Sequence, residues 1–225
     1  MKWGVVVFPA SNCDYDAYFA LKNILKCEVE FLWHKERNLK NVDVVVLPGG
    51  FSYGDYLRCG AMARFSPVME EVISFANKGH PVMGICNGFQ VLTEAGLLEG
   101  TLMKNKTLKF MCKQVWVKSQ TTQGVWSHNT EKNKVLKMPI AHGEGNYFVT
   151  QEKLKELEDN DQIAFRYCDE KGEVLETSNP NGSVSNIAGV YNKNKNILGL
   201  MPHPERACES ILGSEDGRVL LESVL

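Results

Sequence analysis

The first ninety residues alternate short apolar runs with segments whose apolar residues recur at helical spacing. Tyr18, Leu21 and Leu25 predict a helix capped by Ser11, and apolar positions after Ser66 predict a second helix. Buried strands are predicted at residues 3–8, 27–33, 42–47 and 81–83. This alternation of strands and helices is typical of a parallel sheet with helices on both faces.

The second half of the chain has a different pattern, in which strands follow one another with mixed alternation. Strands are predicted at residues 108–118, 135–141, 162–168, 187–191 and 197–201, and helices at residues 150–159 and 219–224. We expect these strands to extend the sheet or to form a small antiparallel layer. No repeat, linker or composition shift interrupts the chain, so the sequence predicts one α/β domain over residues 1–225, with a mostly parallel sheet and a small antiparallel extension.

Composition and charge exclude several classes of partner. The formal net charge of −2 gives no electrostatic basis for binding nucleic acid or an anionic membrane. No apolar run approaches the ~20 residues that cross a bilayer. The seven cysteines have no regular spacing and no Cys-x-x-Cys pair. They indicate a reduced, cytoplasmic protein without structural disulfides or a metal site.

One cysteine lies where a predicted strand turns into a predicted helix. Within the segment GICNGFQ, residues 84–90, Gly84 and Gly88 stand two positions before and after Cys86. Because glycines allow a sharp turn and close packing, this spacing is typical of a nucleophile elbow. The helix N-terminus beside the sulfur favours a thiolate. We therefore interpret Cys86 as a nucleophile rather than as one more buried thiol. A nucleophilic cysteine requires a base nearby.

A histidine and a glutamate near the C-terminus can supply that base. His203 and Glu205 follow the strand predicted at residues 197–201, within the segment PHPER. Prolines hold this segment extended, so side chains two positions apart can point to the same side. The carboxylate can then orient the imidazole, whose outer nitrogen takes a proton from Cys86. The three residues predict a Cys-His-Glu catalytic triad.

The two motifs resemble those of the class I, triad-type glutamine amidotransferases, which implies a flavodoxin-like sheet. Four further segments resemble one branch of that family, the glutaminase subunits of phosphoribosylformylglycinamidine synthase in purine biosynthesis. They are FPASNCD at residues 8–14, PGGFSYGD at 48–55, LRCGA at 57–61 and AHGEGN at 141–146. The resemblance covers nearly the whole chain, and only residues 114–137 match no motif.

The resemblance implies hydrolysis of L-glutamine through a thioester on Cys86, with release of ammonia. Each tetrahedral intermediate carries an oxyanion, and the N–H of Asn87, directly after the nucleophile, is a natural donor to it. The resemblance implies that the N–H of Gly50 is the second donor. It also places Gln90 beside the substrate, and we expect Phe51, His142 and Gly143 to line the substrate site.

The resemblance further implies a partner, because free ammonia in water becomes unreactive ammonium. Ammonia passes to the large synthetase subunit of the same enzyme, which converts formylglycinamide ribonucleotide to the amidine. In some organisms a small third subunit helps. No cofactor is expected in this chain, whereas ATP and magnesium are expected on the synthetase. The long loop at residues 51–61 is a candidate docking surface.

Other functions are compatible with parts of this pattern. Another class I glutaminase subunit, serving histidine, pyridoxal phosphate or GMP synthesis, would carry the same triad. A γ-glutamyl hydrolase or cysteine peptidase can use the same architecture, although Gln90 favours glutamine. A non-catalytic binding subunit has no need of Cys86, His203 and Glu205 together.

Overall fold

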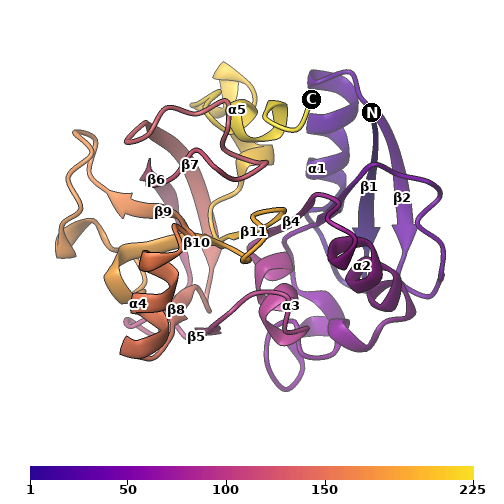
Figure 1. The fold of residues 1–225 in the computed structure, drawn as a ribbon, viewed down its shortest axis with the longest axis horizontal. Coiled ribbons are helices and arrows are strands. Elements are labelled where there is room, and N and C mark those ends of the chain that lie inside the picture. The colour runs from indigo at the N-terminus through magenta and orange to yellow at the C-terminus, as the bar shows by residue number, and fades with distance from the viewer.

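In the computed structural model, which describes residues 1–225, nine strands form one mixed sheet (Figure 1). Their order is β2 (Glu28–Trp33), β1 (Lys2–Val7), β3 (Val44–Leu47), β4 (Val82–Ile85), β11 (Ile197–Leu200), β10 (Ile187–Tyr191), β9 (Ile163–Cys168), β6 (Met111–Ser119) and β7 (Val135–His142). The strands from β2 to β11 are parallel, and each later pair is antiparallel. The predicted α/β class is confirmed, but the antiparallel extension is not small, because it adds four strands.

The central strands explain why the parallel half forms. Every residue of β3, β4 and β11 is buried, as expected for strands covered on both faces. Their apolar side chains belong to one hydrophobic core that also includes residues of β9 and β10. Two three-residue strands that the sequence did not predict, β5 (Thr101–Met103) and β8 (Asn146–Phe148), form a separate antiparallel pair.

Five helices pack around these strands. They are α1 (Asp14–Phe19), which continues as a π-helical turn over Ala20–Ile24, α2 (Pro67–Asn77), α3 (Asn87–Glu94), α4 (Gln151–Asp159) and α5 (Gly217–Glu222). The prediction that Ser11 caps the first helix is wrong. Cys13 occupies the N-cap position of α1, while the Ser11 hydroxyl donates to the carbonyl of Phe8 and so closes the turn after β1.

The antiparallel half brings a distant strand to the end of the parallel half. In Figure 1, β6, β7 and β9 lie to the left and β1 and β2 to the right. The edge strand β7 nevertheless contacts the segment after β11, since the N–H of His203 donates to the carbonyl of Pro139 at 2.8 Å. The connection between β6 and β7 is tied to the opposite part of the sheet, because buried Trp126 packs edge-on against Trp3 of β1.

Three loops meet at the carboxyl ends of adjacent parallel strands. Leu47 of β3 and Gly199 of β11 are both paired with Gly84 of β4. The segments that follow these strands carry Gly49-Gly50, Cys86 and His203. The predicted convergence of these motifs at one edge of the sheet is confirmed, and it is the position where open α/β sheets bind ligands.

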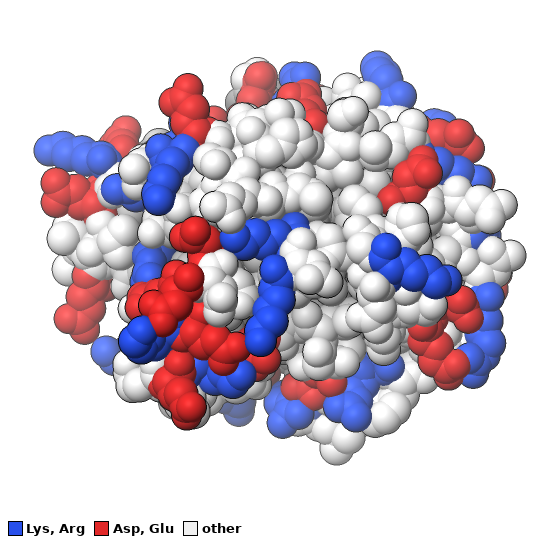
Figure 2. All heavy atoms as spheres, in the orientation of Figure 1, with Lys and Arg blue, Asp and Glu red and all other residues white.

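Charged side chains of both signs occur across the face of the protein seen in Figure 2. Acidic and basic side chains are interspersed there, with an acid-rich group over α4. Among the helices, none is both long and apolar enough to cross a membrane.

Candidate active site

The nucleophile candidate occupies a strained turn between β4 and α3. Cys86 is the N-cap of α3 and has φ 50° and ψ −104°, a conformation that a residue with a Cβ rarely adopts. The turn is tight because α3 packs onto the end of β3, where a Cβ added at Gly88 would overlap the carbonyl oxygen of Leu47. The Cys86 thiol is buried and its Sγ lies 3.7 Å from the carbonyl oxygen of Ala141 in β7.

The base candidate is a buried imidazole paired with a carboxylate. His203 Nδ1 donates to Glu205 Oε1 at 2.6 Å, and both side chains are about 1% exposed. Burial by itself lowers the pKa of His203, but the charges of Glu205 and Cys86 outweigh it and raise that pKa above its ordinary value. His203 Nε2, the second ring nitrogen, is buried and has no hydrogen-bond partner. It is therefore free to exchange a proton with a neighbouring group.

A glycine allows this imidazole to approach the nucleophile. A Cβ added at Gly49 would lie 2.7 Å from His203 Cε1 and 3.4 Å from Cys86 Cβ. The His203 ring and Cys86 therefore both border the space above Gly49, which any larger residue would fill. The two motifs, which lie far apart in the sequence, therefore meet at Gly49. Cys86 and His203 form no hydrogen bond with each other, since Cys86 Sγ faces the carbonyl of Ala141 and His203 Nε2 has no partner.

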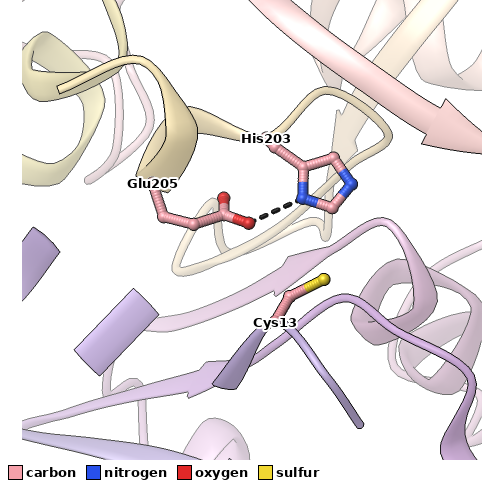
Figure 3. A group of neighbouring side chains, drawn as sticks. All are labelled: Cys13, His203 and Glu205. Carbon is pink, nitrogen blue, oxygen red and sulfur yellow. Dashed lines mark hydrogen bonds and ion pairs between the residues drawn. The ribbon is translucent and has the colours of Figure 1, made fainter. Parts of the chain in front are cut away.

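A second thiol lies beside the same histidine and carboxylate (Figure 3). Potential ligand atoms of Cys13, His203 and Glu205 lie within 4.8 Å of one another, which is close enough to hold a metal ion. The guanidinium of Arg206, however, donates to Cys13 Sγ at 3.1 Å, and a cation there would repel a metal. Burial, followed by the charge of Glu205, raises the pKa of Cys13 to about 12. Cys13 is thus a protonated thiol, whereas Cys86 opens into the adjoining cavity.

That cavity, of about 210 Å³, contains most of the residues predicted to bind substrate. Its lining includes Gly50, Phe51, Cys86, Gln90, Phe110, Ala141, His142 and Gly143. The rings of Phe51 and Phe110 lie 6.4 Å apart, and both are about half exposed. A second cavity, of about 470 Å³, touches Glu205 but not Cys86. The smaller cavity is the one in which a substrate can meet the thiol.

Of the two predicted oxyanion donors, Gly50 lines this cavity, and Asn87 directly follows Cys86, which also lines it. Gly50 has φ 126°, and its N–H forms none of the loop hydrogen bonds of the protein. Asn87 is the first residue of α3, so its N–H has no partner within the helix. Its side chain accepts a hydrogen bond from the N–H of Ser52 at 3.1 Å, which joins the loop after β3 to the start of α3.

Gln90 forms hydrogen bonds within the protein that shape the cavity. Its Oε1 accepts from Asn87 Nδ2 at 2.8 Å, and its Nε2 donates to the carbonyl of Glu144 at 2.6 Å. The side chain is buried and spans from α3 to the loop after β7. Gln90 therefore holds two walls of the cavity together.

The sequence analysis did not identify Asn105, which organises the loop after β7. Asn105 is fully buried, and its Nδ2 donates to the carbonyl groups of Lys109 and His142. Its Oδ1 accepts from His142 Nδ1 and from the N–H of Gly145, both at 3.0 Å. No sequence signal could have revealed this, since His142 and Gly145 lie about forty positions away from Asn105 and Asn105 matches no catalytic motif.

Comparisons with known proteins agree with this geometry. The sequence model of the CobB/CobQ-like glutamine amidotransferase domain matches residues 1–218. The phosphoribosylformylglycinamidine synthase subunit PurQ of Aquifex aeolicus is 56% identical over 225 residues, covering all of this chain and 99% of that protein. The subunit of the same name from Synechocystis is 54% identical over 222 residues, covering 99% of each chain.

Solved structures also include chains that are similar to this one. A chain in the structure of PurLQS from Thermotoga maritima superposes with a TM-score of 0.88 at 39% identity, covering 99% of this chain and 96% of that one. A glutamine amidotransferase from Thermotoga maritima has a TM-score of 0.54 at 18% identity, over 100% of this chain and 90% of that one. The latter likeness shows a shared fold alone.

Proposed function

Since this chain belongs to the family of CobB/CobQ-like glutamine amidotransferase domains, we propose that Cys86, His203 and Glu205 hydrolyse L-glutamine within a single domain over residues 1–225. The chain functions as the glutaminase subunit of phosphoribosylformylglycinamidine synthase in purine biosynthesis. The observation that supports the catalytic assignment is the cavity in which Cys86 and Gly50 face the same space, with the His203–Glu205 pair beside it.

The reaction begins at the sulfur. The proton of the Cys86 thiol passes to His203 Nε2, whose raised pKa favours the imidazolium, and Cys86 Sγ then attacks the side-chain amide carbon of glutamine. The carbonyl oxygen becomes an oxyanion, which the N–H groups of Gly50 and Asn87 stabilise. When the tetrahedral intermediate collapses, His203 returns the proton to the departing nitrogen. Ammonia leaves and a glutamyl thioester remains on Cys86.

Water completes the cycle. His203 Nε2 takes a proton from a water molecule, which attacks the thioester carbon and forms a second oxyanion in the same hole. Collapse of this intermediate breaks the carbon–sulfur bond, releases glutamate and returns the proton to the Cys86 sulfur. Throughout, Glu205 Oε1 holds the Nδ1 proton of His203 and stabilises the imidazolium form.

The ammonia is used by the synthetase subunit, with which related chains assemble in the PurLQS structure. The loop at residues 51–61, with the helical turn Ala63–Phe65 that follows it, is our candidate for the contact with that subunit. Phe51, Asp55 and Cys59 of this loop line the cavity, and the segment exposes three large apolar side chains: Tyr56 at 75%, Leu57 at 90% and Phe65 at 72%. Leu57 also has a positive φ of 71°, so an unfavourable backbone conformation presents this side chain to solvent.

Three further assignments complete the proposal. The chain carries no cofactor of its own, because the thiol, imidazole and carboxylate suffice for amide hydrolysis. ATP and magnesium bind to the synthetase subunit. The protein acts in the cytoplasm, where reducing conditions would keep all seven cysteines as the free thiols found in the structure.

Glutamate release from glutamine tests the catalytic assignment, measured for the purified chain alone and with its synthetase. We expect the partner to stimulate hydrolysis and Cys86→Ala to lower kcat by about 10⁴-fold or more. Cys27→Ala, at a partly buried thiol just before the edge strand β2 and outside the cavity lining, is the matched control and should retain activity. Undiminished hydrolysis by Cys86→Ala would exclude Cys86 as the nucleophile. Cleavage of γ-glutamyl peptides without glutamine hydrolysis would indicate a hydrolase instead.

A further inference from the structure

The cavity at Cys86 contains two acidic side chains and no basic one. Asp55 and Glu144 line it, and no lysine or arginine does. Glutamine carries an α-ammonium group at the end remote from its reactive amide, and carboxylates are the natural partners of such a cation. We propose that Asp55 and Glu144 bind the α-ammonium group of glutamine and so restrict the site to amides that carry a free α-amino group. This inference rests on the glutaminase function proposed above.

Asp55 is held toward the cavity by residues of the catalytic turn. Its Oδ1 accepts a hydrogen bond from Asn87 Nδ2 at 3.2 Å, directly after the nucleophile. Tyr53, Gly54 and Asp55 all have positive φ, and Asp55 itself has φ 53°. Such a turn costs energy for the two residues that have a Cβ, and it places the Asp55 carboxylate beside α3 rather than in solvent.

Glu144 is held by the opposite wall. Gln90 Nε2 donates to its carbonyl at 2.6 Å, and the next N–H, that of Gly145, donates to Asn105 Oδ1 at 3.0 Å. Both polar groups of the peptide bond after Glu144 are therefore held by buried side-chain amides. Its carboxylate enters the cavity from the loop after β7, whereas that of Asp55 enters from the loop after β3.

No lysine or arginine lines the space that the two carboxylates share. Burial, and in addition the charge of Glu144, raise the pKa of Asp55. The thiol of Cys59 lies beside both groups, and burial together with their charges raises its pKa, so it stays neutral. The guanidinium of Arg58 interacts with the charge of Glu144 from outside the cavity lining, but its two hydrogen bonds of 2.6 Å go to Glu94. A substrate ammonium would supply the missing positive charge.

An independent observation at His142 also indicates a donor ligand in this cavity. His142 lines the cavity, is 3% exposed, and its Nε2 has no hydrogen-bond partner. Because both Asn105 Nδ2 hydrogens bind carbonyl groups, Asn105 Oδ1 must accept from His142 Nδ1, which leaves Nε2 as an acceptor. Burial, followed by the charge of His203, lowers the pKa of His142 to about 4, so the ring is neutral. A buried acceptor without a donor fits a site that receives an ammonium or amide N–H.

Kinetics with two substrates test the proposal in the assembled complex with the synthetase subunit. The substrates are L-glutamine and glutaramic acid, the same amide without its α-amino group. We expect Asp55→Asn and Glu144→Gln each to lower kcat/KM for glutamine about 10- to 100-fold, mainly through KM, because a charge-assisted hydrogen bond is lost. The same substitutions should leave kcat/KM for glutaramic acid unchanged or higher, since that substrate makes no such bond.

Two controls distinguish a loss of substrate binding from a general effect of removing a charge and from weaker assembly with the synthetase. Glu152→Gln, on the exposed face of α4, should affect neither substrate. The affinity for the synthetase, measured by titration calorimetry, should be unchanged in Asp55→Asn and Glu144→Gln. Equal losses for both substrates would assign the carboxylates a structural role and overturn the inference, with the glutaminase function intact. Absence of glutamine hydrolysis by the wild-type complex would instead reject the proposed function itself.

Discussion

At the scale of single residues, the environment of a thiol or imidazole decides its chemistry. Burial, followed by the charge of Glu205, raises the pKa of both Cys13 and Cys208 to about 12, which keeps them as thiols. Cys86 differs from them in its position, because it is the N-cap residue of α3 and lines a cavity. The two histidines at the site also have different partners. His203 is hydrogen-bonded to the carboxylate of Glu205, whereas His142 is hydrogen-bonded to the side-chain amide of Asn105.

His142 predicts a specific dependence of stability on pH. Its pKa is about 4 in the folded protein and about 6.5 when unfolded, so the unfolded state binds more protons between these values. Stability should therefore fall as pH falls from 6.5 to 4, with His142 contributing about 3 kcal/mol of this loss. His203 does not contribute in this window, because its raised pKa leaves it protonated in both states below pH 6.5 and its stabilising effect is lost only at higher pH.

Urea unfolding of wild type and His142→Asn at several pH values measures this contribution. The variant should be less stable at pH 7, yet it should lose about 3 kcal/mol less than wild type between pH 6.5 and 4. Parallel stability curves over that range would show that His142 does not titrate as the structure indicates.

At the scale of elements, the site depends on α3 packing directly on the end of β3. This contact places the α3 N-terminus beside Gly50 and points Cys86 into the cavity. Gly88 makes it possible, because it has no side chain where Leu47 approaches. The strain at Cys86 is thus maintained by the packing of two elements rather than by local preference.

Substitution at Gly88 should therefore cost more than substitution at an ordinary glycine. Gly88→Ala places a methyl group against the backbone of Leu47, which cannot move without shifting β3, and we expect a loss of about 3 kcal/mol. Gly79→Ala is the control, because nothing lies within 4 Å and only its positive φ opposes the change, at about 1 kcal/mol. Thermal unfolding measures both, and equal losses would contradict close packing at Gly88.

At the scale of the whole molecule, the mouth of the cavity lies beside an exposed apolar loop. Tyr56, Leu57 and Phe65 are among the most exposed large apolar side chains of the protein. A partner that covers this loop would also cover the cavity and keep ammonia from solvent. Assembly and protection of the product would then depend on the same surface.

Leu57→Asp should weaken binding to the synthetase about tenfold or more, because a central apolar contact is replaced by a buried charge. Ile211→Asp is a matched control, since Ile211 is 89% exposed compared with 90% for Leu57 but lies near the C-terminus. Analytical ultracentrifugation of the mixed subunits measures both affinities. If Ile211→Asp weakens assembly and Leu57→Asp does not, the docking surface lies elsewhere.

The sequence by itself determined the features that depend on neighbouring residues. Apolar runs predicted the buried strands, and the glycines around Cys86 predicted the turn into α3, because both patterns express local backbone geometry. The His203–Glu205 spacing likewise predicted the hydrogen bond between them, now seen at 2.6 Å. The longer apolar runs were sufficient to predict strands, whereas β5 and β8 have three residues each, too few to show a strand pattern.

Only the tertiary structure decided which distant residues meet. The antiparallel half of the sheet brings Ala141 and His142 beside Cys86, more than fifty positions away in the chain. The same long-range packing places Cys13 next to His203 and uses Asn105 to fix the loop after β7. These contacts depend on the order of the nine strands in the sheet. No local pattern encodes that order, because the residues of a strand specify that it is extended but not which strand it pairs with.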